Sequence, residues 1–357
     1  MLGELLLKIK TVFVNRVLKN FSPTYIISAR IQSIVKTNTN ALVNKQEYLF
    51  WLSQNQRGES LSETKMRVFA NITPAEGILK NIQKLALALL KEFNKICKEN
   101  DISYWIMGGT IIGSIRHKGF IPWDDDVDIG MMRKDYDKLK KVLENHPFLE
   151  VLEFYNFNGL YRIPKVVVKG SDAKLAMDII LFDYANTSNY KISEDASNEE
   201  IFDYVWSKQQ KIRNAYTRRL KLFKTRVLDV KKTDLIKDPK KFEKATKITQ
   251  KYIDKCHYQY DEGDLIVWGI DNFTSKAPDK RRIYTTSSIF PLCQLEFEGD
   301  MYPAPSDYLD MIIREAGDIW KFPNDVGKPK FFNEKQLEIE YAKTENAVKE
   351  LGLCLED

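Results

Sequence analysis

The chain has 357 residues with 43% hydrophobic and 29% charged side chains, which describes a soluble globular protein and excludes a disordered one. Its four cysteines lie far apart without a CxxC pair, which argues against a zinc ribbon or a disulfide framework and fits a reducing cytoplasm. With only three histidines, a metal site would be built from oxygen ligands, which suits magnesium, manganese or calcium better than zinc.

The formal net charge of +5 is concentrated near the N-terminus. Residues 1–45 hold seven basic side chains and one acidic one, so the rest of the chain is close to neutral. This distribution argues against a general nucleic-acid-binding surface, and we expect no nucleic-acid partner. The apolar spacing in this segment predicts two amphipathic helices, which can lie on an anionic membrane surface or pack on the protein itself or a second copy. With no membrane-spanning run and no cleavage site evident, we expect a cytoplasmic protein, peripheral at the inner face of the membrane in the first case.

The next predicted helix starts at the segment TPAE. Thr73 is placed to cap it, Pro74 fits the first turn, and Glu76 completes a capping box, with the helix running to about Glu99. The segment ISYWIM (102–107) then predicts a strand that enters two glycines, and TIIGSIRH predicts a short helix that starts at those glycines.

The remaining elements mix helices and strands without strict alternation, which favours an α+β fold. WDDDVDIGM predicts a strand and RKDYDKLKKVLENH a helix, while YRIPKVVVK and LAMDIILFDYA (175–185) predict two further strands. A Lys-rich helical insertion is expected at about 198–257, interrupted near VKKTDLIKDPKK, and a charged helix at the end. The predicted domains are a basic helical extension (1–55), a catalytic domain (70–335) that contains the insertion, and a C-terminal helix (336–357).

Clustered aspartates stand at the start of the strand WDDDVDIGM. Strand alternation places Asp124, Asp126 and Asp128 on one face and Asp125 on the other. Three carboxylates on one face repel one another and raise their pKa values unless a divalent cation lies among them. Asp178 lies in the apolar strand LAMDIILF, where an unpaired carboxylate is costly. A metal shared by the three aspartates and Asp178 would stabilise both features.

Two other interpretations of the aspartates stay open. The spacing DxDxD copies the first three positions of an EF-hand calcium loop, although Ile129 and Asp135 stand where such a loop has glycine and glutamate. The cluster can also be a solvated acidic turn with salt bridges to Arg116 or Lys118.

Gly108 and Gly109 add a second element to the metal interpretation. A glycine pair between a strand and a helix allows close backbone approach and aims N–H groups at an anion. Together with Arg116 and the aspartates, it supplies the parts that phosphoryl transfer needs. A glycine pair, a DxD pair and one distant aspartate on another strand form a nucleotidyltransferase-type pattern.

The segment GGTIIGSIRHKGFIPWDDDVDI (108–129) resembles the motif of the LicD family, the phosphocholine transferases that also include the fukutin-related proteins. MDIILFD and FEG…YPAPSDYLDMIIREAGDIWKFP resemble two further family segments in the same order, so the resemblance covers roughly 70–330. The chain departs from the family at Ala316, where a tyrosine is usual, and in having no histidine after Pro323.

The resemblance implies a nucleotidyltransferase-like mixed sheet flanked by helices and a CDP-linked donor such as CDP-choline. It implies transfer of phosphocholine or a similar phospho-alcohol to a hydroxyl of a cell-surface glycan, as in lipopolysaccharide, capsule or teichoic acid biosynthesis, with release of CMP. Two alternatives stay open. One is a nucleotidyltransferase that moves a nucleoside monophosphate to a sugar, RNA or a small molecule, and the other is a non-catalytic glycan-binding scaffold.

The resemblance also implies roles for individual residues. Asp126 and Asp128 would bind Mg²⁺ or Mn²⁺, with Asp178 as third ligand or as base and Asp124 extending the acidic face. The implied phosphate-binding residues are Gly108, Gly109 and Thr110 through backbone amides, and Arg116 and Lys118 through charge. An aromatic cage for choline could draw on any of four tryptophans, Trp105, Trp123, Trp268 and Trp320.

Overall fold

The computed structural model describes residues 44–156, 160–169, 177–190, 192–193, 195–225, 239–272, 282–321 and 334–350. The helices predicted before residue 44 and most of the predicted interruption at VKKTDLIKDPKK lie outside these residues. Backbone contacts divide the chain into two compact units, Met1–Val68 and Phe69–Asp357. The predicted domain limits stay predictions. Within the described residues, no helix combines the length and apolar character needed to cross a bilayer.

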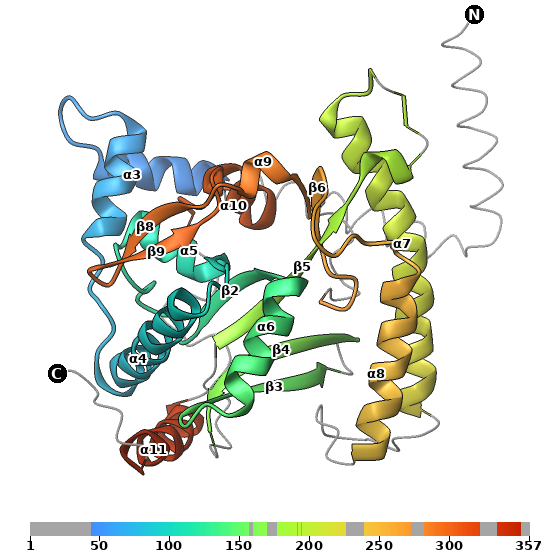
Figure 1. The fold of residues 1–357 in the computed structure, drawn as a ribbon. Coiled ribbons are helices and arrows are strands. Elements are labelled where there is room, and N and C mark those ends of the chain that lie inside the picture. The colour runs from blue at the N-terminus through green and yellow to red at the C-terminus, as the bar shows by residue number, and fades with distance from the viewer. Residues whose placement is uncertain are drawn as a thin grey trace, which may run out of the picture. The chain divides into compact units, whose positions relative to one another are not determined.

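In the part of the second unit that the structure describes, the central element is a seven-stranded mixed sheet (Figure 1). Its strands are β1 (Trp105–Ile106), β2 (Val127–Met132), β3 (Leu149–Asn156), β4 (Tyr161–Val168), β5 (Met177–Ala185), β6 (Leu265–Trp268) and β7 (Ile283–Thr285). The order is β1-β2-β5-β4-β3, while β6 pairs with the later part of β5, and β7 pairs with β6. Strands β2 and β5 are parallel, and the other described pairs are antiparallel. The predicted α+β class and mixed sheet are confirmed.

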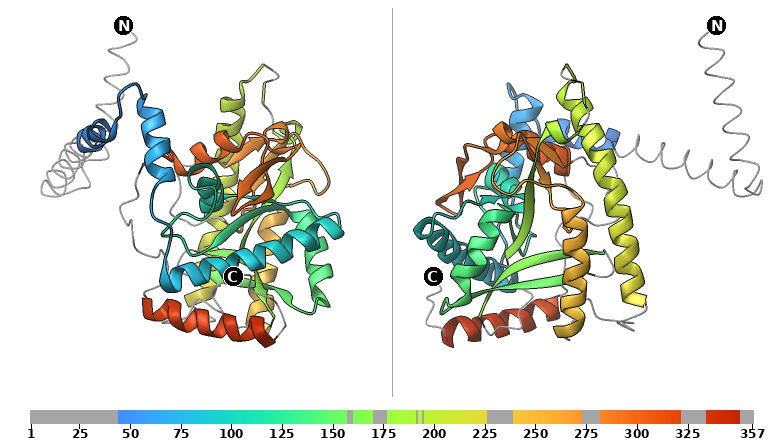
Figure 2. Two further views of the ribbon diagram at one scale, coloured as in Figure 1. Left: turned by 90° about the vertical axis from the view of Figure 1, so that its left-hand side faces the viewer. Right: turned by 45° about the vertical axis from the view of Figure 1, so that its right-hand side comes forward.

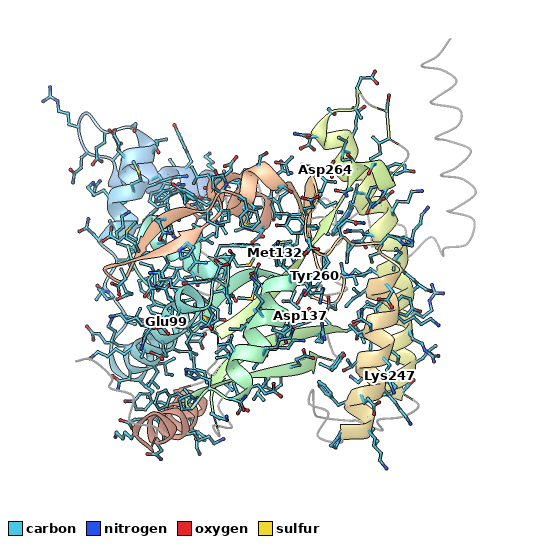
Figure 3. The ribbon with its side chains drawn as sticks, in the orientation of Figure 1. Glu99, Met132, Asp137, Lys247, Tyr260 and Asp264 are labelled. Carbon is cyan, nitrogen blue, oxygen red and sulfur yellow. The ribbon has the colours of Figure 1, made fainter. Side chains whose placement is uncertain are left out.

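Helices flank this sheet. They are α4 (Gly77–Glu99), α5 (Gly108–Arg116), α6 (Arg133–Glu144), α7 (Asn198–Phe223), α8 (Pro239–Asp254), α9 (Thr286–Ile289), α10 (Tyr308–Ala316) and α11 (Glu334–Glu350). The long helices α7 and α8 of the predicted insertion run side by side, and α11 packs on α4 (Figures 1 and 2). Helix α10 and the two-stranded hairpin of β8 (Cys293–Phe297) and β9 (Asp300–Ala304) gather around α5. The chain after α8 is tied to α6, because the Tyr260 hydroxyl donates to Asp137 at 3.2 Å (Figure 3).

The first unit contains a helix over residues 44–54 and most of α3 (Leu61–Ala70). The segment between them is held by Glu59, whose carboxylate pairs with Arg67 at 2.7 Å.

Alternating apolar residues explain the central strands. Ile129 and Met131 on β2 and Ile179 and Leu181 on β5 are fully buried on one face of the sheet. Burial of each such side chain contributes about 1.5–3 kcal/mol, so this layer fixes the register of β2 against β5. The residues between them in sequence therefore point to the opposite face, which carries the candidate site.

Several predicted boundaries are wrong. Helix α4 begins at Gly77 rather than at Thr73, and Glu76 makes no side-chain cap. Gly77 has a φ of +60°, a left-handed conformation that interrupts a helix, so the helical path cannot extend back to Pro74. Strand β1 is limited to two residues, and β2 starts at Val127 instead of Trp123. The strands β3, β6, β7, β8 and β9 were not predicted.

Candidate active site

Helix α5 begins at the two glycines that follow β1, as predicted. The backbone of Asp128 is held against this start by two hydrogen bonds, since Met107 N–H donates to Asp128 O and Asp128 N–H donates to the Thr110 hydroxyl, both at 3.0 Å. Gly108 has a φ of +55°, and a Cβ there would meet Asp128 Oδ2 at 2.5 Å. A Cβ on Gly109 would likewise collide with the Asp124 carboxylate. The two glycines therefore leave room for the close approach of two carboxylates, and the positive φ of Gly108 also favours glycine there.

The structure gives Thr110 a different part from the predicted one. Its backbone N–H donates to Met107 O at 3.1 Å, so this amide is engaged within the turn. The hydroxyl holds β2 through Asp128 N–H, as described above. Thr110 thus positions Asp128, while Gly108 and Gly109 line the neighbouring pocket.

The three consecutive aspartates lie between the turn that ends at Asp124 and the start of β2, a segment that we call the acidic turn, and the predicted alternation is wrong for them. Because β2 begins only at Val127, residues 124–126 do not follow the period of a strand. The turn is closed by the Asp124 N–H, which donates to Ile121 O at 2.9 Å, and Gln83 Nε2 on α4 donates to Asp124 O at 2.9 Å. Asp125, expected on the opposite face, therefore joins the cluster.

The cluster joins Asp124 and Asp126 of the four predicted metal ligands with Asp125, and it does not include Asp128 or Asp178. One carboxylate oxygen from each of Asp124, Asp125 and Asp126 lies within 4.8 Å of the others, and Asp124 and Asp125 are only 5% and 2% exposed. Gathered, largely buried carboxylate oxygens form the donor set that Mg²⁺ or Mn²⁺ prefers. The residues present are therefore compatible with a divalent cation.

Asp128 and Asp178 lie side by side on neighbouring strands. In the parallel pair β2–β5, residue 128 is the register partner of residue 178. Register partners of adjacent strands carry their side chains on the same face of the sheet, at a strand spacing of about 4.8 Å. The two aspartates, fifty positions apart in the sequence, thus share the face on which α5 begins.

Lys165 completes this row and was missed by the sequence interpretation. It is the register partner of Asp178 on β4, and its Nζ lies 2.5 Å from Asp178 Oδ1. The available signal was a lone lysine in the apolar strand YRIPKVVV. The ion pair fixes the Asp178 carboxylate and offsets the repulsion between Asp178 and Asp128.

We therefore predict that Lys165→Met lowers kcat about 10- to 100-fold, the usual cost of losing a partner that orients a functional carboxylate. The substrate KM should change little, whereas the melting temperature should fall because Asp178 then lies beside Asp128 without its cation. Lys165→Arg should restore part of the rate and of the stability because it keeps the charge. Steady-state kinetics on both variants check this, with Lys169→Met, an exposed lysine just after β4, as the control. Wild-type kcat in Lys165→Met would contradict the orienting role.

A pocket of about 570 Å³ opens beside the aspartates. Its lining comes from α5, the acidic turn, β5, β6, the start of β7 and α10, and includes Gly108, Gly109, Arg116, Trp123, Asp124, Asp128, Ile180, Trp268, Arg282, Glu315, Asp318 and Lys321. Of the predicted site residues, Thr110, Lys118, Asp126 and Asp178 are not among those that line it. The exposed side chain of Lys118 instead lies 4.0 Å from Glu296 on β8. Of the four tryptophans, Trp123 and Trp268 line the pocket, whereas Trp105 is fully buried against Phe182.

Arg116 is only 6% exposed and lies on the wall of this pocket. Its Nη1 donates to Ile319 O at 2.6 Å, and its guanidinium lies 4.4 Å from the centre of the Phe69 ring. Burial lowers its pKa to about 10, although Asp124 acts in the opposite direction. The group therefore stays charged at neutral pH and is held rigidly beside the acidic cluster.

Comparison with known proteins gives one family and several relatives. Residues 101–208 match the family described as LicD/FKTN/FKRP, nucleotidyltransferase domain. The chain is 46% identical over 78 residues, 22% of its length and 28% of the relative's, to the "Lipopolysaccharide cholinephosphotransferase LicD" of Haemophilus influenzae. It is 47% identical over 41 residues, 12% of its length and 8% of the relative's, to the "Ribitol 5-phosphate transferase FKRP" of Homo sapiens. A further relative, "Uncharacterized protein RP689" of Rickettsia prowazekii, is 46% identical over 55 residues, 15% of the chain and 21% of the relative. The chain thus spans less than a third of the length of each of these relatives.

Proposed function

Residues 101–208 belong to the LicD family of nucleotidyltransferase domains, and on that premise we propose that the protein transfers a phospho-alcohol from a CDP-linked donor to a glycan hydroxyl. Phosphocholine is the first candidate cargo, because a relative is named as a lipopolysaccharide cholinephosphotransferase. Ribitol 5-phosphate is the second, after the name of a more distant relative. The single observation that carries the proposal is that Asp128 and Asp178 are register partners on neighbouring strands, beside the acidic turn.

In the proposed reaction, the oxygen of the acceptor hydroxyl bonds to the phosphorus of the phospho-alcohol, and the bond from that phosphorus to CMP breaks. The hydroxyl proton passes to a carboxylate, for which Asp178 is the candidate, and CMP leaves with the electron pair. Mg²⁺ or Mn²⁺ held by Asp126 and Asp128, with Asp124 and Asp125 beside them, would supply Lewis-acid stabilisation of the diphosphate charge. Arg116 stabilises negative charge on the transferring group.

The location of the aspartates supports these roles for the carboxylates and for Arg116. Asp124 and Asp128 approach the first residues of α5, where backbone N–H groups and the helix dipole favour negative charge. A diphosphate bound in the adjoining pocket would meet the same helix end and Arg116. The proposed site thus offers positive charge on the pocket wall and carboxylates at its base.

The test is to incubate the full chain with CDP-choline, Mn²⁺ and an oligosaccharide derived from lipopolysaccharide. We expect CMP release that matches the phosphocholine gained by the glycan, measured by chromatography and mass spectrometry. A CDP-linked ribitol donor is run in parallel. Release of pyrophosphate from nucleoside triphosphates, with the nucleotide attached to a sugar, would instead identify a nucleotidyltransferase. Glycan binding without CMP release from either CDP-linked donor would favour the scaffold.

A further inference from the structure

A second arginine, Arg282, lines the same pocket. It stands directly before β7, where Trp268 N–H donates to Arg282 O at 3.2 Å and so extends the ladder between β6 and β7. Trp268 is in turn the register partner of Phe182 on β5. Phe182 lies four residues after Asp178 on the same strand, so the side chains of this row share the face of the sheet that carries Asp178. Neither composition nor local sequence pattern indicated this arrangement.

The Arg282 guanidinium is stacked on an aromatic ring. Its Cζ lies 3.5 Å from the centre of the Trp268 ring, which is itself braced edge-on by Phe182 at 5.9 Å. Burial lowers the pKa of Arg282, and the more distant charge of Glu315 opposes that shift. Among the described residues Arg282 has no ion-pair partner, and its buried Nε has no hydrogen-bond partner.

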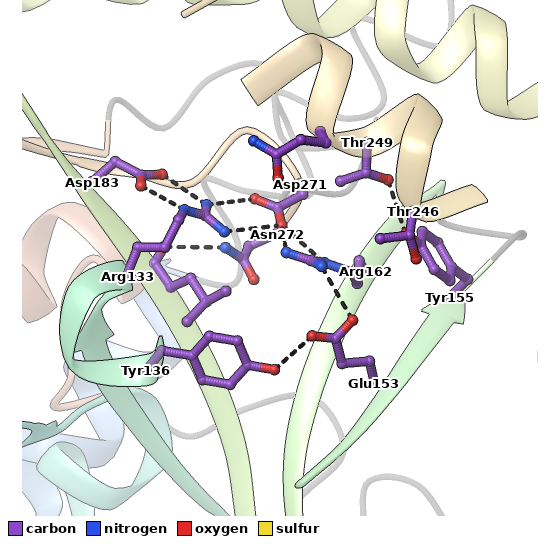
Figure 4. A network of polar contacts seen from close by, with 12 residues as sticks. Arg133, Tyr136, Glu153, Tyr155, Arg162, Asp183, Thr246, Thr249, Asp271 and Asn272 are labelled. Atoms are coloured by element: carbon purple, nitrogen blue, oxygen red, sulfur yellow. Dashed lines mark hydrogen bonds and ion pairs between the residues drawn. The ribbon is translucent and has the colours of Figure 1, made fainter. Parts of the chain in front are cut away.

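Two other arginines of this fold are compensated by carboxylates. On the opposite face of the sheet, Arg133 is paired with Asp183 and Asp271, and Arg162 with Asp271 and Glu153 (Figure 4). Taking a charged group out of water without a partner is unfavourable, so such pairing is the expected arrangement. The two pocket arginines differ, because Arg116 Nε is also buried without a hydrogen-bond partner. Guanidinium groups that line a pocket without an ion-pair partner among the described residues are suited to bind an anionic ligand.

The stack also decides what the Trp268 end of the pocket recognises. A tryptophan face can hold a quaternary ammonium, but here one face is covered by a cation. A choline head group at the same ring would meet a like charge. The chemistry at Trp268 therefore favours phosphate over trimethylammonium.

We propose that Arg282, held in place by Trp268, is an anion-binding residue, and that Arg116 and Arg282 together bind the two phosphoryl groups of a diphosphate-linked donor. The donor class rests on the proposed function, whereas the binding of a diphosphate by Arg282 is testable without turnover. The negative charge of Asp124 acts on Arg116, whereas the negative charge of Glu315 and the positive charge of Arg213 act on Arg282. In this proposal Arg116 binds the phosphoryl group beside the acidic turn, and Arg282 binds the other one.

The test is calorimetric titration of the full chain with inorganic pyrophosphate at a fixed Mg²⁺ concentration. We expect Arg282→Met to weaken pyrophosphate binding about 10- to 100-fold, as loss of a charge-assisted contact does. Arg282→Lys should weaken it less, about 3- to 10-fold, because lysine keeps the charge but loses the planar fork. The control is Arg314→Met on α10, whose side chain pairs with Asp310 outside the pocket and whose loss should leave the affinity unchanged. Inorganic phosphate should bind more weakly than pyrophosphate and depend less on Arg282.

Wild-type pyrophosphate affinity in Arg282→Met would overturn the inference, as would absence of pyrophosphate binding by the wild type. Should Arg282→Met fail to fold, Arg282→Lys decides the matter, because a folded variant with wild-type affinity leaves Arg282 only a packing role. The outcome is separable from the proposed function. Arg282-dependent pyrophosphate binding without turnover of either CDP-linked donor rejects only the function, and undiminished turnover of these donors by Arg282→Met rejects only the inference.

Discussion

Replacing Asp128 by asparagine is expected to lower turnover by about 10³-fold or more while the protein remains folded. A bound divalent cation contributes several kcal/mol to phosphoryl transfer, and each 1.36 kcal/mol is tenfold in rate. Asparagine has the shape of aspartate, and the two backbone bonds that hold residue 128 to α5 do not involve its side chain. Loss of one negative charge next to Asp178 should if anything raise stability, because like charges repel.

The control is Asp300→Asn, which removes an exposed carboxylate on β9 that pairs with Lys91 at 3.5 Å. Initial rates with CDP-choline, Mn²⁺ affinity by calorimetry and thermal melting are compared for both variants. Ordinary activity in Asp128→Asn would exclude the metal role. Asp178→Asn distinguishes the two roles proposed for that residue. If Asp178 is a metal ligand, the variant loses Mn²⁺ affinity together with turnover. If Asp178 is the base, the variant loses turnover alone.

The site residues that were predicted from sequence either lie close together in the chain or are unusual for their sequence surroundings. The glycines, Arg116 and the aspartates lie within one short segment, so their proximity needs only one strand, one turn and one helix. Asp178 was identifiable at a distance because a carboxylate in an apolar strand requires a partner. The structure places it beside Asp128 through a parallel register that apolar alternation on both strands stabilises.

The features that were missed depend on pairing between distant strands. Lys165 becomes significant only once β4 is paired with β5, and Arg282 only once β7 extends the row through Trp268. Nothing within a few residues of Arg282 encodes that partner. The prediction that the strand includes the consecutive aspartates was wrong for a different reason. The Asp124 N–H donates to Ile121 O, and Gln83 on α4 donates to Asp124 O, so the backbone is held in a turn just before the strand begins. Tertiary contacts thus overrode the local alternation of apolar and acidic residues.

A buried ion network on the other face of the sheet joins five segments (Figure 4). Arg133 at the start of α6 forms two bonds to Asp183 on β5, at 2.6 and 2.8 Å, and two to Asp271, at 2.9 and 3.5 Å. Arg162 on β4 donates to the Asp271 carboxylate at 3.0 and 2.5 Å. Its third contact is Glu153 on β3, at 3.2 Å, which also accepts from the Tyr136 hydroxyl. Asp271, which is fully buried after β6, therefore neutralises two arginines from different strands and helices.

Asp271→Asn is expected to destabilise the protein by about 3–5 kcal/mol, the cost of breaking a buried ion pair by removing one partner. Burial raises the pKa of Asp271, but the charges of Arg133 and Arg162 outweigh it and hold the pKa below its ordinary value of 3.8. The carboxylate is thus ionised in the folded protein throughout the neutral range. Chemical denaturation at pH 7 measures the difference. The control Asp310→Asn breaks a partly exposed pair with Arg314, whose contact is 2.6 Å, and should cost at most about 1 kcal/mol.

The stability difference between the wild type and Asp271→Asn should depend on pH in a definite direction. Because the folded pKa of Asp271 is lowered, its stabilising contribution is present above the unfolded pKa and declines as the pH falls toward the folded value. The stability gap between wild type and Asp271→Asn should therefore be constant near neutrality and narrow below about pH 4. A gap that instead widens in acid, or a variant as stable as the wild type at pH 7, would mean that Arg133 and Arg162 are satisfied without this carboxylate. The network would then fill space between strands without holding them together.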